Sequence, residues 1–197
     1  MKKKESKLYA FTKPLVDLYV KIFHKPEYIG LENIPSEGKI ILAGTHTHSQ
    51  DSFLLMSVTK RPVHFMAKKE LWEFPKGLLF AHMGLIKVDR DRKSPASLIE
   101  AKEYLDDGKV VLIFPEGTLE PEHGKLLPFR IGAVKLAYDT NTKIVPFAIK
   151  GHYYNKDLSI RFGKPMKISS DLDKEIERLK NTIEDLRKWL HEDAMVI

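Results

Sequence analysis

Short apolar runs alternate with helical patterns along most of the chain. The runs are rich in branched aliphatic residues and occupy residues 39–44, 62–67, 84–88, 109–114, 143–149 and 158–163. The clearest helical stretch covers residues 94–108, with Ser94 as N-cap, Pro95 in the first turn and Gly108 beyond the end. Continuous apolar strands that alternate with helices indicate an α/β fold, with a mixed, largely parallel sheet flanked by helices.

An amphipathic pattern near the N-terminus predicts a helix. Its apolar residues recur every three or four positions, with lysines on another face; they are Leu8, Phe11, Leu15, Leu18 and Ile22. Pro14 suits a first turn, so the well-formed part is expected to run from Pro14 to about Phe23. Such a helix either lies in a membrane interface or packs on the domain, and periodicity alone leaves both interpretations open.

A second amphipathic pattern closes the chain. Asp171 is a candidate N-cap, and the apolar residues behind it keep a spacing of four and three; they are Leu172, Ile176, Leu179, Ile183, Leu186 and Leu190. The pattern is too short to indicate a coiled coil. It predicts a helix that packs on the surface of the domain.

The composition is that of a globular chain. With 197 residues, 43% of them hydrophobic and 30% charged, it can build one domain with a sizeable core, and it excludes a disordered or fibrous protein. The chain has no cysteine, which excludes disulfides and thiolate metal sites. No apolar stretch approaches the roughly 20 residues of a spanning helix. The basic start also lacks a signal-peptide pattern, so we expect a cytoplasmic protein.

The net charge of +6 is unevenly distributed along the sequence. Residues 1–30 and 60–93 are net basic, whereas residues 169–197 are net acidic. The two basic regions indicate an anionic partner, and nucleic acid, phospholipid headgroups and a phosphorylated substrate all qualify. Neither basic region has the interleaved aromatic residues typical of nucleic-acid binding, so no nucleic-acid partner is expected.

His46, His48 and Asp51 lie where the apolar run 39–44 gives way to a helix. Two histidines two residues apart on extended backbone point to one side and could bind a metal. Alternatively, His46 in the loop and Asp51 in the first turn of the helix form an acid–base pair, in which the carboxylate fixes the tautomer of the ring. A polar helix start that only caps the helix is the third interpretation.

Four blocks occur in a fixed order and together carry a resemblance. They are H-x4-D at 46–51, G-x-x-x-V-D-R at 84–90, F-P-E-G-T at 114–118 and I-V-P-F at 144–147. In this order they resemble the glycerolipid acyltransferase family, specifically its bacterial-type 1-acyl-sn-glycerol-3-phosphate acyltransferases. The resemblance covers about residues 30–165.

The resemblance implies both the reaction and the residues that perform it. His46 would deprotonate the hydroxyl of 1-acyl-sn-glycerol 3-phosphate, which attacks an acyl thioester, and Asp51 would orient the ring. The donor would be acyl-CoA or acyl-carrier protein and the product phosphatidic acid, with no metal and no further cofactor. The residues expected to bind the acceptor and its phosphate are Arg90, Lys68, Glu116, Gly117 and Thr118. Glu116 is acidic, so it is expected to position the loop rather than contact the phosphate.

The sequence departs from the family pattern at three places. The family commonly has asparagine before the histidine and serine two residues after it, and here these positions hold Thr45 and His48. The family's arginine after F-P-E-G-T is replaced by Leu119. The missing cation could be supplied by another basic residue; the candidates are Arg90, Lys68, Lys125 and Arg130.

Residues 1–29 are therefore expected to form a membrane-association segment, and residues 30–197 the acyltransferase domain. The partners would be a phospholipid membrane surface, the thioester donor and the lysophospholipid acceptor, with the protein peripheral on the cytoplasmic face of the cell membrane. Two alternatives remain. One is a metal-dependent hydrolase that uses His46, His48 and Asp51, and the other is a non-catalytic membrane-binding module.

Overall fold

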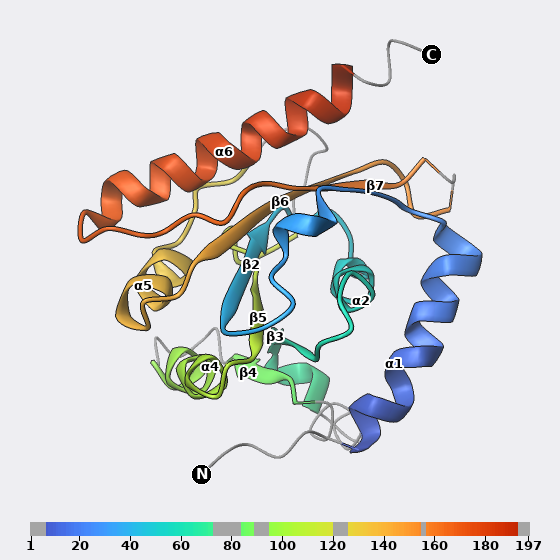
Figure 1. Cartoon of the computed structure of the whole chain (residues 1–197), viewed down its shortest axis with the longest axis horizontal. Helices are drawn as coiled ribbons and strands as arrows, with labels where there is room; N and C mark the ends of the chain where they lie inside the picture. Colours follow the sequence, from blue (N-terminus) through green and yellow to red (C-terminus); the bar gives the residue numbers. More distant parts are fainter. Residues whose placement is uncertain (1–6, 73–83, 89–94, 120–125, 155–156, 193–197) are drawn as a thin grey trace.

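A single sheet of seven strands forms the centre of the protein (Figure 1). The computed structural model describes residues 7–72, 84–88, 95–119, 126–154 and 157–192. The strands are β1 Glu27–Ile29, β2 Ile40–Gly44, β3 Val63–Lys68, β4 Ile86–Val88, β5 Val110–Ile113, β6 Ile144–Lys150 and β7 Ser159–Phe162. Six of these strands match the six apolar runs of the sequence. The short strand β1 was not predicted.

The strand order is β1-β7-β6-β2-β5-β3-β4. All neighbouring pairs are parallel except β6 and β7, which are antiparallel. The mixed, largely parallel sheet predicted from the sequence is thus confirmed. Because β2, β3, β5 and β6 run in the same direction, their carboxyl ends meet at one edge of the sheet, where ligands of such sheets bind.

Helices cover both faces of the sheet (Figure 1). They are α1 Lys7–Tyr19, the π-helix η1 Val20–His24, the 3-10 helices η2 Leu31–Asn33 and η3 Lys69–Trp72, α2 Asp51–Met56, α4 Ala96–Asp106, α5 Gly132–Asp139 and α6 Leu172–Glu192. One core cluster includes buried residues of α1 and α2, and the other includes buried residues of α4, α5 and α6. The sheet therefore lies between two helical layers.

Strand β2 shows how the sequence builds these two layers. Ile40 and Leu42 belong to the cluster beneath α1 and α2, whereas Ile41 and Ala43 belong to the cluster beneath the other helices. All four side chains are buried. A strand that is covered on both faces has no polar side, which explains why the run reads as continuously apolar.

The N-terminal helix is present, but its start differs from the prediction. Pro14 lies inside α1 rather than in its first turn, so the prediction for this proline was wrong. The turn before it is anchored by packing, because Tyr9 is buried and its hydroxyl accepts a hydrogen bond of 2.9 Å from the Val63 backbone N–H of β3. This anchor stabilises helix on both sides of the proline, whose φ angle is already helical.

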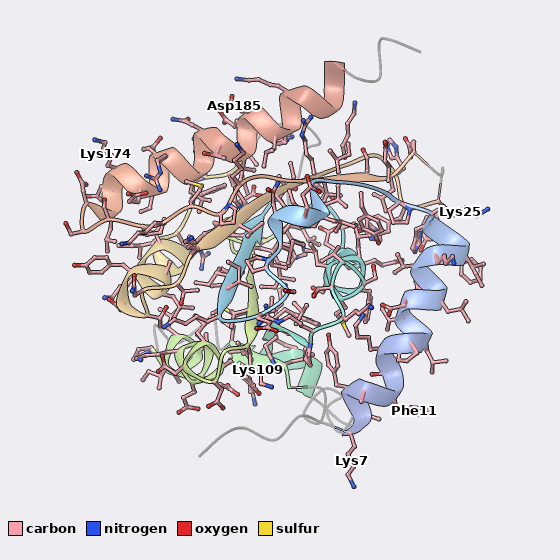
Figure 2. All side chains as sticks on the ribbon, viewed as in Figure 1. Lys7, Phe11, Lys25, Lys109, Lys174 and Asp185 are labelled. Carbon is pink, nitrogen blue, oxygen red and sulfur yellow. The ribbon has the colours of Figure 1, made fainter. Side chains whose placement is uncertain are left out.

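No described residue covers the outer side of α1 and η1 (Figure 2). Its large apolar side chains are exposed; they are Phe11, Leu15, Leu18, Ile22 and Phe23. The inner side carries the buried residues Tyr9, Val20 and His24. Among the helices in the described ranges, none is both long enough and apolar enough to cross a bilayer.

The other two predicted helices are confirmed. In α6, the Asp171 carboxylate accepts a hydrogen bond of 3.2 Å from the Lys174 N–H, as an N-cap does. In α4, Gly108 follows the last turn with a φ of +76°, a conformation that glycine adopts without strain. The predicted N-cap of α4, Ser94, lies outside the described residues.

Candidate active site

Segments that follow four parallel strands meet at the carboxyl edge of the sheet. They are residues 45–50 after β2, Lys68 at the end of β3, residues 114–118 after β5 and residues 151–154 after β6. Each lies where a buried apolar strand ends, so its polar groups lie at the edge of the core. This edge is where the fold places a site.

The chain leaves β2 through a glycine and a threonine that fix its path. A Cβ atom at Gly44 would lie 2.1 Å from the Phe147 carbonyl oxygen, so only glycine allows β2 to approach β6 this closely. The buried Thr45 hydroxyl then accepts a hydrogen bond of 2.9 Å from the Ile149 N–H. The threonine that replaces the family's usual asparagine thus ties the histidine loop to β6.

His46 and Asp51 contact each other as the sequence predicted. His46 lies in the loop and Asp51 in the first turn of α2, and the His46 Nδ1–H donates to Asp51 Oδ2 at 3.0 Å. The ring of His46 also stacks on Phe114, with 3.8 Å between centroids and 10° between planes. The carboxylate and the aromatic ring together fix the orientation of the imidazole, and its Nε2 is the nitrogen available to substrate.

The carboxylate of Asp51 is completely buried and accepts four hydrogen bonds. Besides His46, its Oδ2 accepts from the backbone N–H groups of Thr47 and His48, at 2.7 and 2.9 Å. Its Oδ1 accepts from the Tyr153 hydroxyl. Donors on both oxygens stabilise a negative charge that burial alone would disfavour.

Tyr153 was not predicted from the sequence. Burial, together with the charge of Asp51, raises the pKa of its hydroxyl above the usual value, so the hydroxyl remains a protonated donor. One sequence signal could have located it, because "KGHYY" follows the carboxyl end of the strand 143–149, as the other candidate residues follow their strands.

His46 and His48 do not form a common ligand pair of the kind that the metal interpretation assumed. His46 lies against Phe114, whereas His48 stacks on Tyr153 with 4.5 Å between centroids, and its Nδ1 accepts from the Gln50 N–H at 3.2 Å. Within the described part of the chain, no cluster of three or more histidine, aspartate or glutamate side chains could hold a metal ion.

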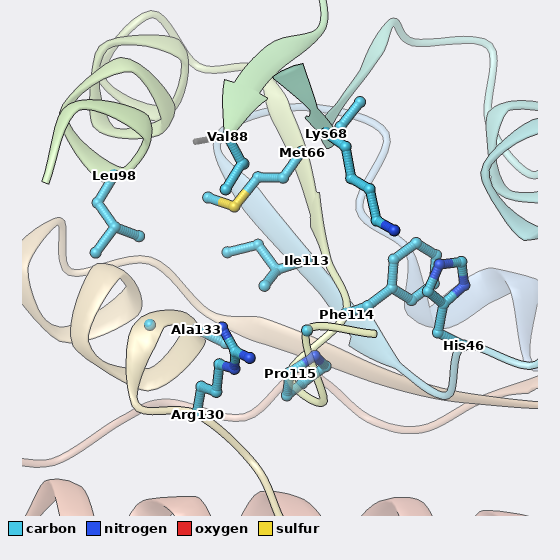
Figure 3. Close-up of a pocket in the computed structure, with 13 residues that line it drawn as sticks. His46, Met66, Lys68, Val88, Leu98, Ile113, Phe114, Pro115, Arg130 and Ala133 are labelled. Carbon is cyan, nitrogen blue, oxygen red and sulfur yellow. The ribbon is translucent and has the colours of Figure 1, made fainter. Parts of the chain in front are cut away.

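A pocket opens beside the His46 ring (Figure 3). Its lining combines the histidine and two basic side chains with apolar groups; the lining residues are His46, Met66, Ala67, Lys68, Val88, Leu98, Ile113, Phe114, Pro115, Gly117, Arg130, Gly132 and Ala133. In Figure 3 the amino group of Lys68 points toward the His46 and Phe114 rings, and Leu98 lies at the other end of the pocket. The pocket therefore has a polar end at His46 and an apolar end.

The predicted binding residues are only partly brought together. Lys68 and Gly117 line the pocket. Glu116 is buried and its Oε2 accepts from the Leu127 N–H at 2.9 Å, and Thr118 is exposed and does not line the pocket. Arg90 lies outside the described residues, as does the alternative cation Lys125.

Arg130, one of the cations considered as a replacement for the family arginine, lines the pocket. A Cβ atom at Gly117 would lie 2.8 Å from Arg130 Nε, so the guanidinium packs against this glycine. The φ of Gly117 is +71° and its N–H donates to the Phe114 carbonyl oxygen at 3.0 Å, closing a tight turn. The turn thus places the Arg130 guanidinium in the same pocket as His46 and Lys68.

Fold and site together define an α/β protein with a histidine–aspartate pair at the carboxyl edge of its sheet, beside a basic and apolar pocket. The family model described as "Acyltransferase" matches residues 25–150, more than half of the chain. The chain belongs to this acyltransferase family, so the resemblance carried by the four sequence blocks is confirmed.

Similar sequences include three bacterial proteins named 1-acyl-sn-glycerol-3-phosphate acyltransferase. The chain is 31% identical to that of Borreliella burgdorferi over 66% of its length, 31% identical to that of Bacillus subtilis over 71%, and 36% identical to that of Helicobacter pylori over 61%. It spans 56%, 66% and 53% of the lengths of these three relatives, respectively.

A solved structure has the same fold. It is the crystal structure of the 1-acyl-sn-glycerophosphate (LPA) acyltransferase PlsC from Thermotoga maritima, with a TM-score of 0.74 and 21% sequence identity. The alignment covers 96% of this chain and 83% of the other. The likeness in fold therefore extends over nearly the whole chain.

Proposed function

We propose that the protein transfers an acyl group from an acyl thioester to the free hydroxyl of 1-acyl-sn-glycerol 3-phosphate and so forms phosphatidic acid. The observation that carries this proposal is the His46–Asp51 pair, with 3.0 Å between Nδ1 and Oδ2, whose histidine lines a pocket that also holds two basic side chains. The names of the bacterial relatives support the choice of acceptor.

His46 acts as the general base in this proposal. With Nδ1 hydrogen-bonded to Asp51, Nε2 accepts the proton of the acceptor hydroxyl while its oxygen attacks the thioester carbonyl. The new C–O bond replaces the C–S bond, and the thiolate takes up a proton as it leaves. Because the chain has no cysteine, no protein thiol forms an acyl intermediate, and direct transfer needs only the base and donors to the oxyanion.

Lys68 and Arg130 hold the phosphate of the acceptor. Both line the pocket that contains His46, and a guanidinium can bind two phosphate oxygens at once. Arg130 thereby supplies the cation that Leu119 does not. Arg90 remains a proposed phosphate ligand on the family resemblance, and Glu116 holds the loop through Leu127.

The acyl donor is acyl-CoA or acyl-carrier protein, and no metal or further cofactor takes part. The apolar end of the pocket, lined by Met66, Val88 and Leu98, suits a hydrocarbon chain rather than a polar group. A base, two cations and an apolar slot match the three parts of the reacting pair: a hydroxyl, a phosphate and an acyl chain.

The exposed apolar side of α1 and η1 binds the membrane that contains the acceptor. Phe11, Leu15 and Phe23 are exposed there, and lysines of the N-terminal segment add attraction to anionic headgroups. The protein is thus proposed to be peripheral, on the cytoplasmic face of the cell membrane. A lipid acceptor then reaches the pocket without leaving the bilayer region.

An acceptor panel with a histidine variant tests the function. Purified protein is mixed with phosphatidylglycerol vesicles, labelled acyl-CoA or acyl-carrier protein, and 1-acylglycerol with or without its 3-phosphate. We expect transfer to the phosphorylated acceptor and a loss of about 10²- to 10⁴-fold in His46→Ala, the usual contribution of a general base. The product is identified as phosphatidic acid by mass spectrometry.

Lys188→Ala is the control, because Lys188 of α6 is exposed and pairs with Asp185, and neither residue lines the pocket. It should keep the wild-type rate. A His46→Ala variant that is as active as wild type would refute the role of His46 as general base. A wild-type protein that transfers no acyl group to any of the acceptors would support the non-catalytic membrane-binding module. Hydrolysis of a substrate that requires added zinc or manganese would support the alternative of a metal-dependent hydrolase.

A further inference from the structure

A buried tyrosine contacts the proposed catalytic pair, and the reaction outlined above does not use it. Tyr153 follows β6, is only 4% exposed and donates its hydroxyl hydrogen to Asp51 Oδ1. The reacting groups contact His46, on the other side of the carboxylate. Tyr153 can therefore act on the reaction only through Asp51.

The two oxygens of Asp51 have separate donors. Oδ2 accepts from His46 and from two backbone N–H groups, whereas among the described residues Tyr153 is the donor that reaches Oδ1. A carboxylate is planar, so fixing both oxygens fixes the direction in which Oδ2 faces the imidazole. The tyrosine also draws negative charge toward Oδ1, away from the histidine.

Two histidines hold Tyr153 in place. His48 stacks on its ring, with 4.5 Å between centroids and 29° between planes. From η1, the ring of His24 lies edge-on at 5.0 Å, and its Nδ1 is 2.5 Å from the Tyr153 carbonyl oxygen. His24 is itself buried. This packing gives His48, the residue that departs from the family pattern, a place beside Tyr153 and outside the lining of the pocket.

We propose, on the basis of the acyl transfer proposed above, that Tyr153 is a positioning residue for the catalytic pair. Its hydroxyl fixes the orientation of Asp51 and shares its charge, and so sets how strongly His46 holds a proton. His48 and His24 support this role by fixing the ring and the backbone of Tyr153.

The surroundings are consistent with a donor that is never ionised. Burial and the neighbouring charge of Asp51 raise the pKa of the Tyr153 hydroxyl, so it does not add a negative charge in the working range of the enzyme. Among the described residues, other titratable groups around the cluster are His24 of η1, Tyr28 of β1, Lys68 of β3, Arg130 before α5, and Tyr19 and Tyr154, whose rings face His24.

Tyr153→Phe removes the donor and keeps the ring. More of the negative charge of Asp51 then lies on Oδ2, which faces His46. This charge stabilises the protonated ring of His46, which therefore keeps its proton to higher pH. We expect kcat to fall about 10- to 100-fold, the usual effect of losing a hydrogen bond to a charged group, with KM for both substrates unchanged within about twofold. The acidic limb of the kcat profile should move to higher pH.

Incorporation of 3-fluorotyrosine at position 153 gives the opposite change. Fluorine makes the phenol a stronger donor while adding almost no volume, so the acidic limb should move to lower pH with KM unchanged. This second variant keeps the test decisive if Tyr153→Phe fails to fold. A purely structural tyrosine would not shift the profile in opposite directions for the two variants.

Tyr138→Phe, at an exposed tyrosine of α5, is the matched control and should behave as wild type. The same shifts are measured without substrate, as the midpoint of the His46 ring titration followed by NMR. If wild type transfers no acyl group, the proposed function fails, while the titration still decides the role of Tyr153. Equal midpoints in wild type and both variants would overturn the inference.

Discussion

Helices α1 and α6 have similar amphipathic patterns but opposite surroundings. In α1, Phe11 is 70% exposed and Leu15 57%, whereas in α6 Leu179 is 1% exposed and Ile183 is fully buried. Both patterns recur every three or four residues, and both helices carry lysines on another face. Periodicity thus identifies a helix with an apolar side, and tertiary packing decides whether that side meets the core or remains uncovered.

The difference has a physical origin in how each helix is attached. α6 packs its apolar stripe on the cluster that includes α4 and α5. α1 and η1 are attached through their other side, where Tyr9 of α1 and Val20 and His24 of η1 are buried. Exposed apolar side chains grouped along one helix mark an interaction surface rather than scattered surface residues, which supports the proposed membrane contact.

The largest effect is expected where the apolar side is buried. Ile183→Ala leaves a cavity beneath α6 and should lower the free energy of unfolding by about 2–5 kcal/mol, measured by urea denaturation. Leu18→Ala, at a 53% exposed position of α1, is the counterpart and should change it by less than about 0.5 kcal/mol. Equal losses at both positions would remove the distinction between the two helices.

A smaller effect is expected for membrane binding through α1. Phe11→Ser removes a side chain whose burial in lipid contributes about 1.5–3 kcal/mol, so partitioning into phosphatidylglycerol vesicles should fall about tenfold or more. Co-sedimentation measures it. Ile99→Ser provides the control, since Ile99 is an exposed apolar residue of α4. If Phe11→Ser binds vesicles as tightly as wild type, α1 is not the membrane-binding surface.

The smallest effect is expected at the N-terminus of α6. α6 has its own N-cap, so Asp171→Ala should cost about 1 kcal/mol of unfolding free energy in the same denaturation assay. Asp185→Ala removes a carboxylate whose partner among the described residues is Lys188, in an exposed pair, and should cost almost nothing. A cost at Asp185 equal to that at Asp171 would argue against the cap.

Local patterns predicted what local forces determine. The six apolar runs became strands and the His46–Asp51 contact formed, because five residues of sequence separation leave few ways to join a loop to a helix start. The position of Pro14 was predicted wrongly because Tyr9 anchors the preceding turn to Val63, 54 residues away. Strand β1, with only three residues, has too short a pattern to recognise.

The rest of the site depends on partners that are distant in the sequence. Tyr153 reaches Asp51 across 102 residues, and no spacing rule connects the two. Arg130 could be named only as one of several cations, because its position beside Gly117 depends on how the segment after β5 folds back. The sequence therefore predicts the His46–Asp51 pair more completely than the residues that surround it, Tyr153 and Arg130.

The central position of β2 also governs when the protein can fold during its synthesis. β2 pairs with β6, as in the contact of Ala43 with Pro146, and Asp51 gains its last donor only from Tyr153. A ribosome adds roughly 5–20 residues per second, so the nascent strand waits for several seconds before its neighbour emerges. A stalled chain that ends before residue 144 cannot complete the sheet around the histidine. The sheet and the Tyr153 contact that support the proposed catalytic pair are thus completed late in translation.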